Sequence, residues 1–167
     1  ADEGCPDNGV TITADNVVLD CDGHTIYGSG RHKGIDINRR NTVEIKNCRV
    51  VNFNRGISVE HSNHVTIRRS TVENNNEFGI HLRGASLNTL AGNEVFKNQQ
   101  GIYLEASSDR NTVEKNTVAD NEFNGITVLS SLNNVFKENT VGKSDQGSGN
   151  LFGFFVRLAH SNTFEDN

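Results

Sequence analysis

Residues Gly101–Asn121, GIYLEASSDRNTVEKNTVADN, decide the fold of this chain. The stretch holds three short runs rich in Val, Ile and Thr, which begin at Ile102, Asn111 and Asn116. Such runs suit β-strands and are too short for helices, while the Asn and Gly residues between them favour bends. The stretch therefore predicts one unit of three strands and three bends.

The same unit recurs along most of the chain. A Gly-Ile step opens each copy, and successive steps are 22, 23, 22 and 24 residues apart. A weaker copy, Gly153-Phe154, follows after a longer interval. A period in the twenties is typical of solenoid proteins. The steps begin at Gly34, Gly56, Gly79, Gly101 and Gly125.

Leucine-rich repeats and parallel β-helices both have periods of this length. Leucine is scarce here, no copy shows an LxxLxL pattern, and long stretches of helical periodicity are missing. The chain is therefore predicted to be all-β, a three-sided parallel β-helix of about six to seven coils, each advancing by about 4.8 Å. We expect a single domain over residues 10–167, after a leader or cap at residues 1–9.

Asn residues recur at equivalent places in successive copies. Asn tolerates the left-handed backbone conformation that a sharp bend requires, and stacked amides could hydrogen-bond from coil to coil. The Gly of each Gly-Ile step would let the chain enter a strand where a side chain would crowd the next coil. Two Asn series are predicted to form ladders: Asn75, Asn98, Asn121, and Asn93, Asn116, Asn139.

Two polar insertions break the period, at Gly28–Lys33 and Gly142–Asn150. Insertions in solenoids often gather on a binding face, although a tolerated surface loop explains them equally well. The chain stops within a coil, where Phe164 would cover an open core end without a cap. We expect that the natural protein continues, or that a partner covers this end through self-association of the open C-terminal coil.

Composition excludes several classes of function. The net charge of -5 argues against a nucleic-acid partner, which would require a basic surface. No apolar run is long enough to span a membrane. Three cysteines leave one thiol over. Cys5 and Cys21 flank the first strand signal and could form a disulfide, but all three, Cys48 included, could equally be small buried apolar residues.

The repeat unit resembles the right-handed parallel β-helix repeat family, as does the opening segment ADNVVLDCDGHTIYGSG at residues 14–30. The resemblance covers roughly residues 10–167. It implies a location outside the cytoplasm: secreted, periplasmic or on the cell surface. Relatives include pectate-lyase-like enzymes, alginate lyases, mannuronan C5-epimerases, polysaccharide hydrolases and a periplasmic protein of copper-enzyme maturation. The Asp-Pro-His-Asp motif associated with the epimerases is absent, because Pro6 is the only proline.

Alternation after each Gly-Ile step predicts which residues face outward. Because Ile35 and Ile37 point inward, the residues after them point outward. Equivalent positions in neighbouring coils then stack about 4.8 Å apart. One predicted column is Asp36, Ser58, His81, Tyr103, Thr127 and Phe155. The other is Asn38, Glu60, Arg83, Glu105, Leu129 and Arg157.

These columns hold the best candidate site in the chain. His81 and Tyr103 could act as base and acid, and Arg83 could hold a sugar carboxylate with two hydrogen bonds. Asp36, Glu60, Arg83 and Glu105 are the candidate substrate-binding residues. The alternating charges would equally suit pairs that only stabilise an exposed sheet, and Tyr is an ordinary strand residue.

Other sites have less support. No CxxC motif is present and no histidine stands at ligand spacing beside the cysteines, while His61 and His64 only flank a bend, so no metal site is predicted and no cofactor is required. Asp20 and Asp22 could hold Ca²⁺, although such pairs are common in turns. A partly Thr column on another sheet is too mixed for ice binding.

Two hypotheses of function follow. One is an extracytoplasmic β-helix that interacts with polysaccharide, as a uronan lyase or C5-epimerase acting on an outward strip of one sheet. The other is a non-catalytic structural or surface-binding solenoid module that stacks or oligomerises through its open end.

Overall fold

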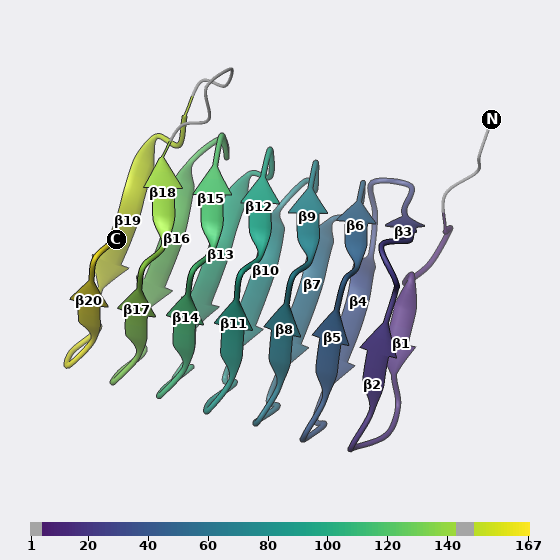
Figure 1. The fold of residues 1–167 in the computed structure, drawn as a ribbon, viewed down its shortest axis with the longest axis horizontal. Coiled ribbons are helices and arrows are strands. Elements are labelled where there is room, and N and C mark those ends of the chain that lie inside the picture. The colour runs from purple at the N-terminus through teal and green to yellow at the C-terminus, as the bar shows by residue number, and fades with distance from the viewer. Residues whose placement is uncertain (1–4, 143–148) are drawn as a thin grey trace.

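The computed structural model describes residues 5–142 and 149–167 and has three parallel β-sheets that form the sides of a solenoid (Figure 1). Each strand pairs with the strand three places further along the chain, so three strands and three corners make one coil. The all-β, three-sided parallel β-helix predicted from the sequence is confirmed. Within the described residues, no helix is long and apolar enough to cross a membrane.

The first sheet carries the longest strands. It consists of β1 (Val10–Ile12), β4 (Lys33–Asn38), β7 (Arg55–Glu60), β10 (Phe78–Arg83), β13 (Gln100–Glu105), β16 (Asn124–Leu129) and β19 (Phe152–Arg157). The second consists of β2 (Val18–Asp20), β5 (Glu44–Lys46), β8 (Thr66–Arg68), β11 (Thr89–Ala91), β14 (Thr112–Glu114), β17 (Val135–Lys137) and β20 (Thr163–Glu165). The third consists of β3 (Thr25–Tyr27), β6 (Arg49–Val51), β9 (Thr71–Glu73), β12 (Glu94–Phe96), β15 (Thr117–Ala119) and β18 (Thr140–Gly142).

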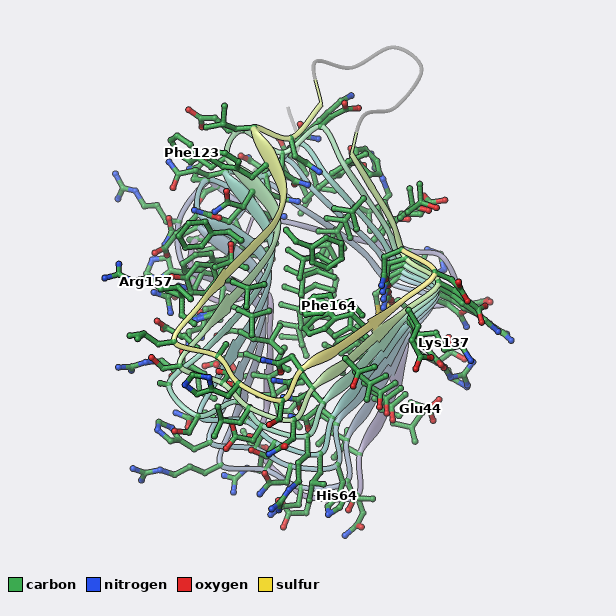
Figure 2. All side chains as sticks on the ribbon, turned by 90° about the vertical axis from the view of Figure 1, so that its left-hand side faces the viewer. Glu44, His64, Phe123, Lys137, Arg157 and Phe164 are labelled. Carbon is green, nitrogen blue, oxygen red and sulfur yellow. A yellow bond between two sulfur atoms is a disulfide. The ribbon has the colours of Figure 1, made fainter. Side chains whose placement is uncertain are left out.

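A narrow apolar core runs through the middle of the rod. The β-branched and Leu side chains of alternating strand positions point inward, where their burial supplies most of the driving force for folding. Seen along the rod, Phe164 lies in this central column, while Arg157 and Lys137 project from opposite sides (Figure 2). The Ile of each Gly-Ile step is fully buried: Ile35, Ile57, Ile80, Ile102 and Ile126.

The glycines of the Gly-Ile steps lie where coils approach most closely. A Cβ atom on Gly56 would lie 2.3 Å from Cγ1 of Val72 and 2.6 Å from the carbonyl oxygen of Gly79 in the next coil. Because the second of these is a backbone atom, it cannot move aside without shifting the coil. This crowding is the reason for the glycine that the sequence repeats.

Both predicted Asn ladders are present. Asn75 Nδ2 donates to Asn98 Oδ1 at 2.9 Å, and Asn98 Nδ2 donates to Asn121 Oδ1 at 3.1 Å. Asn93, Asn116 and Asn139 are linked in the same way, at 3.0 Å for each step.

The conformation predicted for these ladder residues was wrong. The residue before each ladder Asn takes the left-handed conformation, as Asn74 does with φ 54° and Lys97 with φ 56°. The ladder Asn itself points inward, where its amide satisfies backbone groups of the corner.

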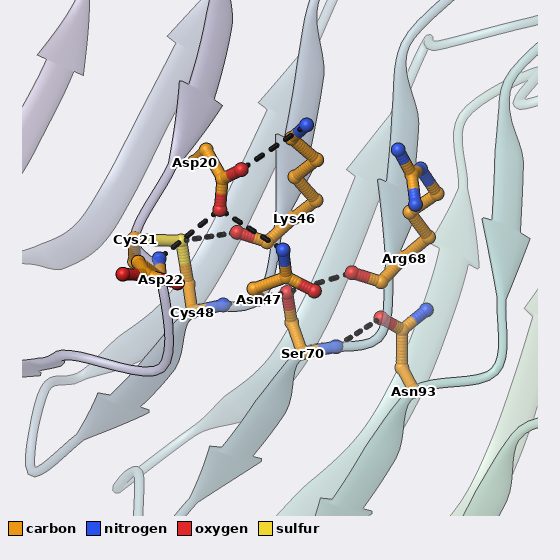
Figure 3. The surroundings of a disulfide bond; sticks show 9 residues. All are labelled: Asp20, Cys21, Asp22, Lys46, Asn47, Cys48, Arg68, Ser70 and Asn93. Carbon is orange, nitrogen blue, oxygen red and sulfur yellow. Dashed lines mark hydrogen bonds and ion pairs between the residues drawn. A yellow bond between two sulfur atoms is a disulfide. The ribbon is translucent and has the colours of Figure 1, made fainter.

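The cysteine pairing proposed from the sequence was also wrong. The disulfide joins Cys21 to Cys48 (Figure 3). Cys5 is a free thiol. Cys21 and Cys48 follow the paired strands β2 and β5, so they occupy the same corner of consecutive coils, with 4.8 Å between their Cα atoms. Cys5 forms a backbone bridge to Gly28 at another corner, away from Cys21.

Candidate functional site

The outer face of the first sheet, β1 to β19, holds the residues selected from the sequence. The strand register places Asp36 beside Ser58, Ser58 beside His81, and His81 beside Tyr103. Glu60 lies beside Arg83, which lies beside Glu105. The order predicted for these two columns is therefore confirmed over these coils.

A third outward column was missed by sequence reasoning. It is formed by the residue that precedes each Gly-Ile step, and the regular position of that residue is the signal that could have identified it. Its members are Lys33, Arg55, Phe78, Gln100, Asn124 and Phe152. The position matters because Phe78 and Arg55 lie over the candidate site.

Aromatic rings enclose His81. The Phe78 ring lies 4.5 Å from the His81 ring and 4.7 Å from the Tyr103 ring, measured between centroids. The His81 and Tyr103 rings meet edge to face at 5.8 Å. As a result, only 1% of His81 is exposed, although its side chain is on the outer face of the sheet. A ligand on the surface therefore meets Phe78 and Tyr103 before it meets His81.

His81 is held as a neutral imidazole. Burial lowers its pKa, and the positive charge of Arg55 lowers it further, against the opposing effect of Glu105. Its Nε2 lies 3.1 Å from Glu105 Oε1, and in the neutral ring this nitrogen is the donor. Its buried Nδ1 has no hydrogen-bond partner among the described residues. The imidazole thus orients Glu105 and keeps one nitrogen available as an acceptor.

Glu105 joins the neighbouring residues into one cluster. Arg83 Nε lies 3.4 Å from Glu105 Oε1, and about half of the Arg83 side chain is exposed. Tyr103 is half-buried, and its pKa is raised by burial and by the negative charge of Glu105. Tyr103 therefore keeps its proton and can donate a hydrogen bond from its hydroxyl group.

A second cluster surrounds Glu60. Lys33 Nζ lies 2.9 Å from both Asp36 and Glu60, and Ser58 donates to Glu60 at 3.1 Å. Burial would raise the pKa of Glu60, but the hydrogen bond and charge of Lys33 hold it below its usual value. Glu60 is therefore a fixed anion.

Arg55 connects the two clusters. Its guanidinium lies 5.4 Å from the centroid of the Phe78 ring, within the range of a cation–π contact. It also pairs with Glu60 at 3.4 Å and with Glu77 at 2.8 Å. The structure thus brings together the six candidate residues His81, Tyr103, Asp36, Glu60, Arg83 and Glu105. Phe78 and Arg55 are additional members of the site.

The other candidate sites are not assembled. Among the residues that the structure describes, no three His, Cys, Asp or Glu side chains could hold a metal ion together. Asp20 accepts hydrogen bonds from Asn47 and the Asp22 backbone and pairs with Lys46, which lowers its pKa to about 2. The ammonium of Lys46, 3.1 Å from Asp20, takes the place that a Ca²⁺ ion would require.

Comparison with protein families gives one match. Residues 9–167 match the family model described as "Periplasmic copper-binding protein (NosD)". Comparison with curated proteins gives no match.

Several solved structures have a similar fold. A mutant of the periplasmic alginate epimerase AlgG is 29% identical, with a TM-score of 0.71 over 80% of this chain and 32% of that chain. The A-module of the Azotobacter vinelandii mannuronan C-5 epimerase AlgE4 is 15% identical, with a TM-score of 0.71 over 95% of this chain and 50% of that chain. Pectate lyase Pel9A is 16% identical, with a TM-score of 0.56 over 76% and 36%. This chain thus spans half or less of each of these structures.

Proposed function

We propose that this chain, which belongs to the NosD family, is an extracytoplasmic β-helix that binds an acidic polysaccharide on the outer face of the β1–β19 sheet. The periplasmic description of the family and the Cys21–Cys48 disulfide agree with the location predicted from the sequence, because disulfides persist in oxidising compartments. Polysaccharides are the substrates named for the similar epimerases.

The observation that carries the proposal is the aromatic surface of Phe78 and Tyr103 with guanidinium groups on both sides. Sugar rings pack on aromatic faces through their apolar C–H groups, and such faces give large contact area at low entropic cost. Arg83 is half exposed, pairs through Nε with Glu105, and can turn its terminal guanidinium nitrogens toward a carboxylate. Arg55 is held over Phe78 and supplies positive charge at the other edge.

A second candidate function is catalysis on uronans, as a lyase or a C5-epimerase. It is favoured by the 29% identity to an alginate epimerase and by the neutral imidazole of His81, which can accept a proton. In this hypothesis His81 and Tyr103 exchange protons with the sugar, while Arg83 neutralises its carboxylate. His81 would contact the sugar only after Phe78 moves aside, so binding is the primary proposal.

The copper named in the family description does not fit the described residues. Copper sites use His, Cys and Met ligands, and this sequence has no Met. Cys21 and Cys48 are consumed by the disulfide, and no group of three ligands is assembled in the described part of the chain. We therefore assign no copper step to these residues.

Calorimetric titration with alginate and pectate oligosaccharides, beside neutral dextran oligosaccharides, tests the proposed binding. Tyr103→Ala should weaken uronan binding about 5- to 30-fold, because truncating an aromatic anchor costs about 1–2 kcal/mol. Tyr27 is the matched control, because it is the other tyrosine and lies exposed on the third sheet. Equal loss in Tyr103→Ala and Tyr27→Ala, or equal affinity for dextran, would exclude the proposed site.

The catalytic hypothesis has its own assays. Elimination produces an unsaturated sugar that absorbs in the ultraviolet, and epimerisation exchanges the C5 proton with solvent, which NMR detects in deuterated water. If uronans bind but neither reaction occurs, the catalytic hypothesis is rejected and the binding proposal stands.

A further inference from the structure

A polar groove lies at the corner between the third sheet and the first sheet. Its volume is about 530 Å³, and its walls come from the links between β9 and β10, β12 and β13, and β15 and β16. It is distinct from the aromatic cluster, which is on the outer face of the first sheet. The lining residues are Asn74, Asn75, Asn76, Lys97, Asn98, Gln99, Asp120 and Glu122.

Three consecutive coils contribute equivalent residues to this corner groove. Asn74, Lys97 and Asp120 have left-handed backbones, with φ of 54°, 56° and 54°. Three coils cover two inter-strand spacings, or about 10 Å along the rod. The groove is therefore as long as a short oligosaccharide.

The ladder residues of the groove have no capacity left for a ligand. Asn98 Nδ2 already donates to the carbonyl oxygens of Val72 and Phe96, both at 3.1 Å, and to Asn121. The Asn75 amide donates to Glu73 O and to Asn98 Oδ1. Recognition in the corner groove must therefore come from its other side chains.

Three of these other side chains have unused polar groups. Within the described part of the chain, the side chains of Lys97, Gln99 and Glu122 make no hydrogen bond or ion pair. Together they offer a cationic donor, an amide that both donates and accepts, and an anionic acceptor. Lys97 Nζ lies 5.7 Å from the Phe96 ring, which steadies its stem beside the groove.

Two links at this corner are longer than the others there. Residues 28–32 link β3 to β4, and the link from β18 to β19 begins after Gly142. The first is fixed at the groove, because Asn76 Nδ2 donates to the Gly30 carbonyl at 2.7 Å. At the other end, Gly149 N donates to Asp120 Oδ1 at 3.0 Å. Gly30 and Gly149 thus lie at opposite ends of the groove.

We propose that the corner groove binds a short neutral oligosaccharide, as a second saccharide site separate from the outer face of the first sheet. Each sugar hydroxyl both donates and accepts, which matches the mixed donors and acceptors of Lys97, Gln99 and Glu122. The lining holds one ammonium group, Lys97, and two carboxylates, Asp120 and Glu122, so its negative balance disfavours an anionic sugar. The ammonium group in the wall disfavours a divalent cation.

NMR titration of the ¹⁵N-labelled protein with maltose, cellobiose and an alginate disaccharide tests this proposal. At least one neutral disaccharide should shift the backbone amides of Lys97, Gln99 and Glu122 and the side-chain amide of Gln99. Gln99→Leu and Lys97→Met should each weaken that binding at least fivefold. Absence of these shifts with both neutral sugars, or unchanged affinity in Gln99→Leu, would overturn the proposal.

Lys115→Met is the matched control. Lys115 is also an exposed lysine with a left-handed backbone, φ 53°, but it lies at the corner between the second and third sheets. It should bind neutral sugar as the wild type does, and an equal loss in Lys115→Met would also count against the groove. The alginate disaccharide reports on the outer face through Tyr103, so failure of either site is seen independently of the other.

Discussion

At the scale of single residues, His81 illustrates how a position on the outside of a sheet becomes an interior one. Its backbone lies in the middle of β10, with its side chain directed away from the core. Phe78, three residues earlier, and Tyr103, one coil later, cover it. A buried acceptor without a partner costs about 1–3 kcal/mol, so Nδ1 of His81 does not stabilise the fold, and we propose that it serves the candidate site as an acceptor.

The lowered pKa of His81 predicts a dependence of stability on pH. The unfolded chain binds a proton below the usual value of 6.5, whereas the folded protein resists protonation. His81 therefore contributes stability above that pH, and the contribution is lost as the pH falls from 6.5 through the lower folded value. Urea unfolding should show that the free energy of unfolding falls more between pH 8 and pH 5 for the wild type than for His81→Gln. Parallel curves for the two proteins would contradict this prediction.

The crowding at Gly56 predicts a severe effect of one methyl group. Gly56→Ala should lower the free energy of unfolding by about 2–4 kcal/mol, because the new Cβ meets backbone of the next coil. Gly142→Ala is the control, since no atom of the residues that the structure describes lies within 4 Å of its Cβ position. It should change stability by less than about 1 kcal/mol. Similar losses for the two variants in urea unfolding would refute this explanation.

At the scale of elements, the ladders hold the corners of neighbouring coils together. Asn98 accepts from the backbone and the side chain of Asn75 and donates to three oxygens. Asn98→Ala should therefore cost about 3 kcal/mol or more, because several buried groups lose their partners at once. Asn38→Ala, an exposed residue of β4, should change stability by about 0.5 kcal/mol or less. The denaturant midpoints of the two variants give the comparison.

The elements were predictable because each depends on a local pattern. Alternation and the Gly-Ile step specify the strands, and the period of the chain gives the register that aligns Ser58, His81 and Tyr103. The burial of His81 was not predictable in this way, because it depends on how the Phe78 ring leans across the sheet. The pairing of Cys21 with Cys48 depends on the stacking of two corners that are 27 residues apart in sequence. The prediction considered instead the two cysteines that flank the first strand signal.

At the scale of the whole molecule, strand contacts join each coil to the coils on either side, and the hydrogen bond from Asn76 to Gly30 is a contact that skips one coil. The stability of such rods is nearly the sum of the intrinsic stability of each coil and the interaction energy between neighbouring coils. A change in one coil should therefore affect mainly that coil and its neighbours. The Cys21–Cys48 disulfide links the first coil to the second (Figure 3). It also lies at the start of a hydrogen-bonded ladder, because Cys48 N donates to Ser70 Oγ and Ser70 N donates to Asn93 Oδ1.

Reduction of this disulfide should therefore loosen one end of the rod. Hydrogen exchange measured by mass spectrometry should accelerate in β1 to β3 after reduction, while β10 to β15 stay protected. The Cys5→Ser variant should show the same hydrogen exchange as the wild type, since Cys5 forms no disulfide. Acceleration along the whole rod would show that the coils unfold as one unit.

The Asn ladders also have an evolutionary consequence. Consecutive coils join through the same few bonds, so duplicating one coil would create a new junction identical to those already present. Gene duplication could then lengthen the rod by one strand spacing, about 4.8 Å, without disturbing its other junctions. The length of the corner groove and of the outer face would grow with it, so such proteins could match longer or shorter saccharides by changing their number of coils.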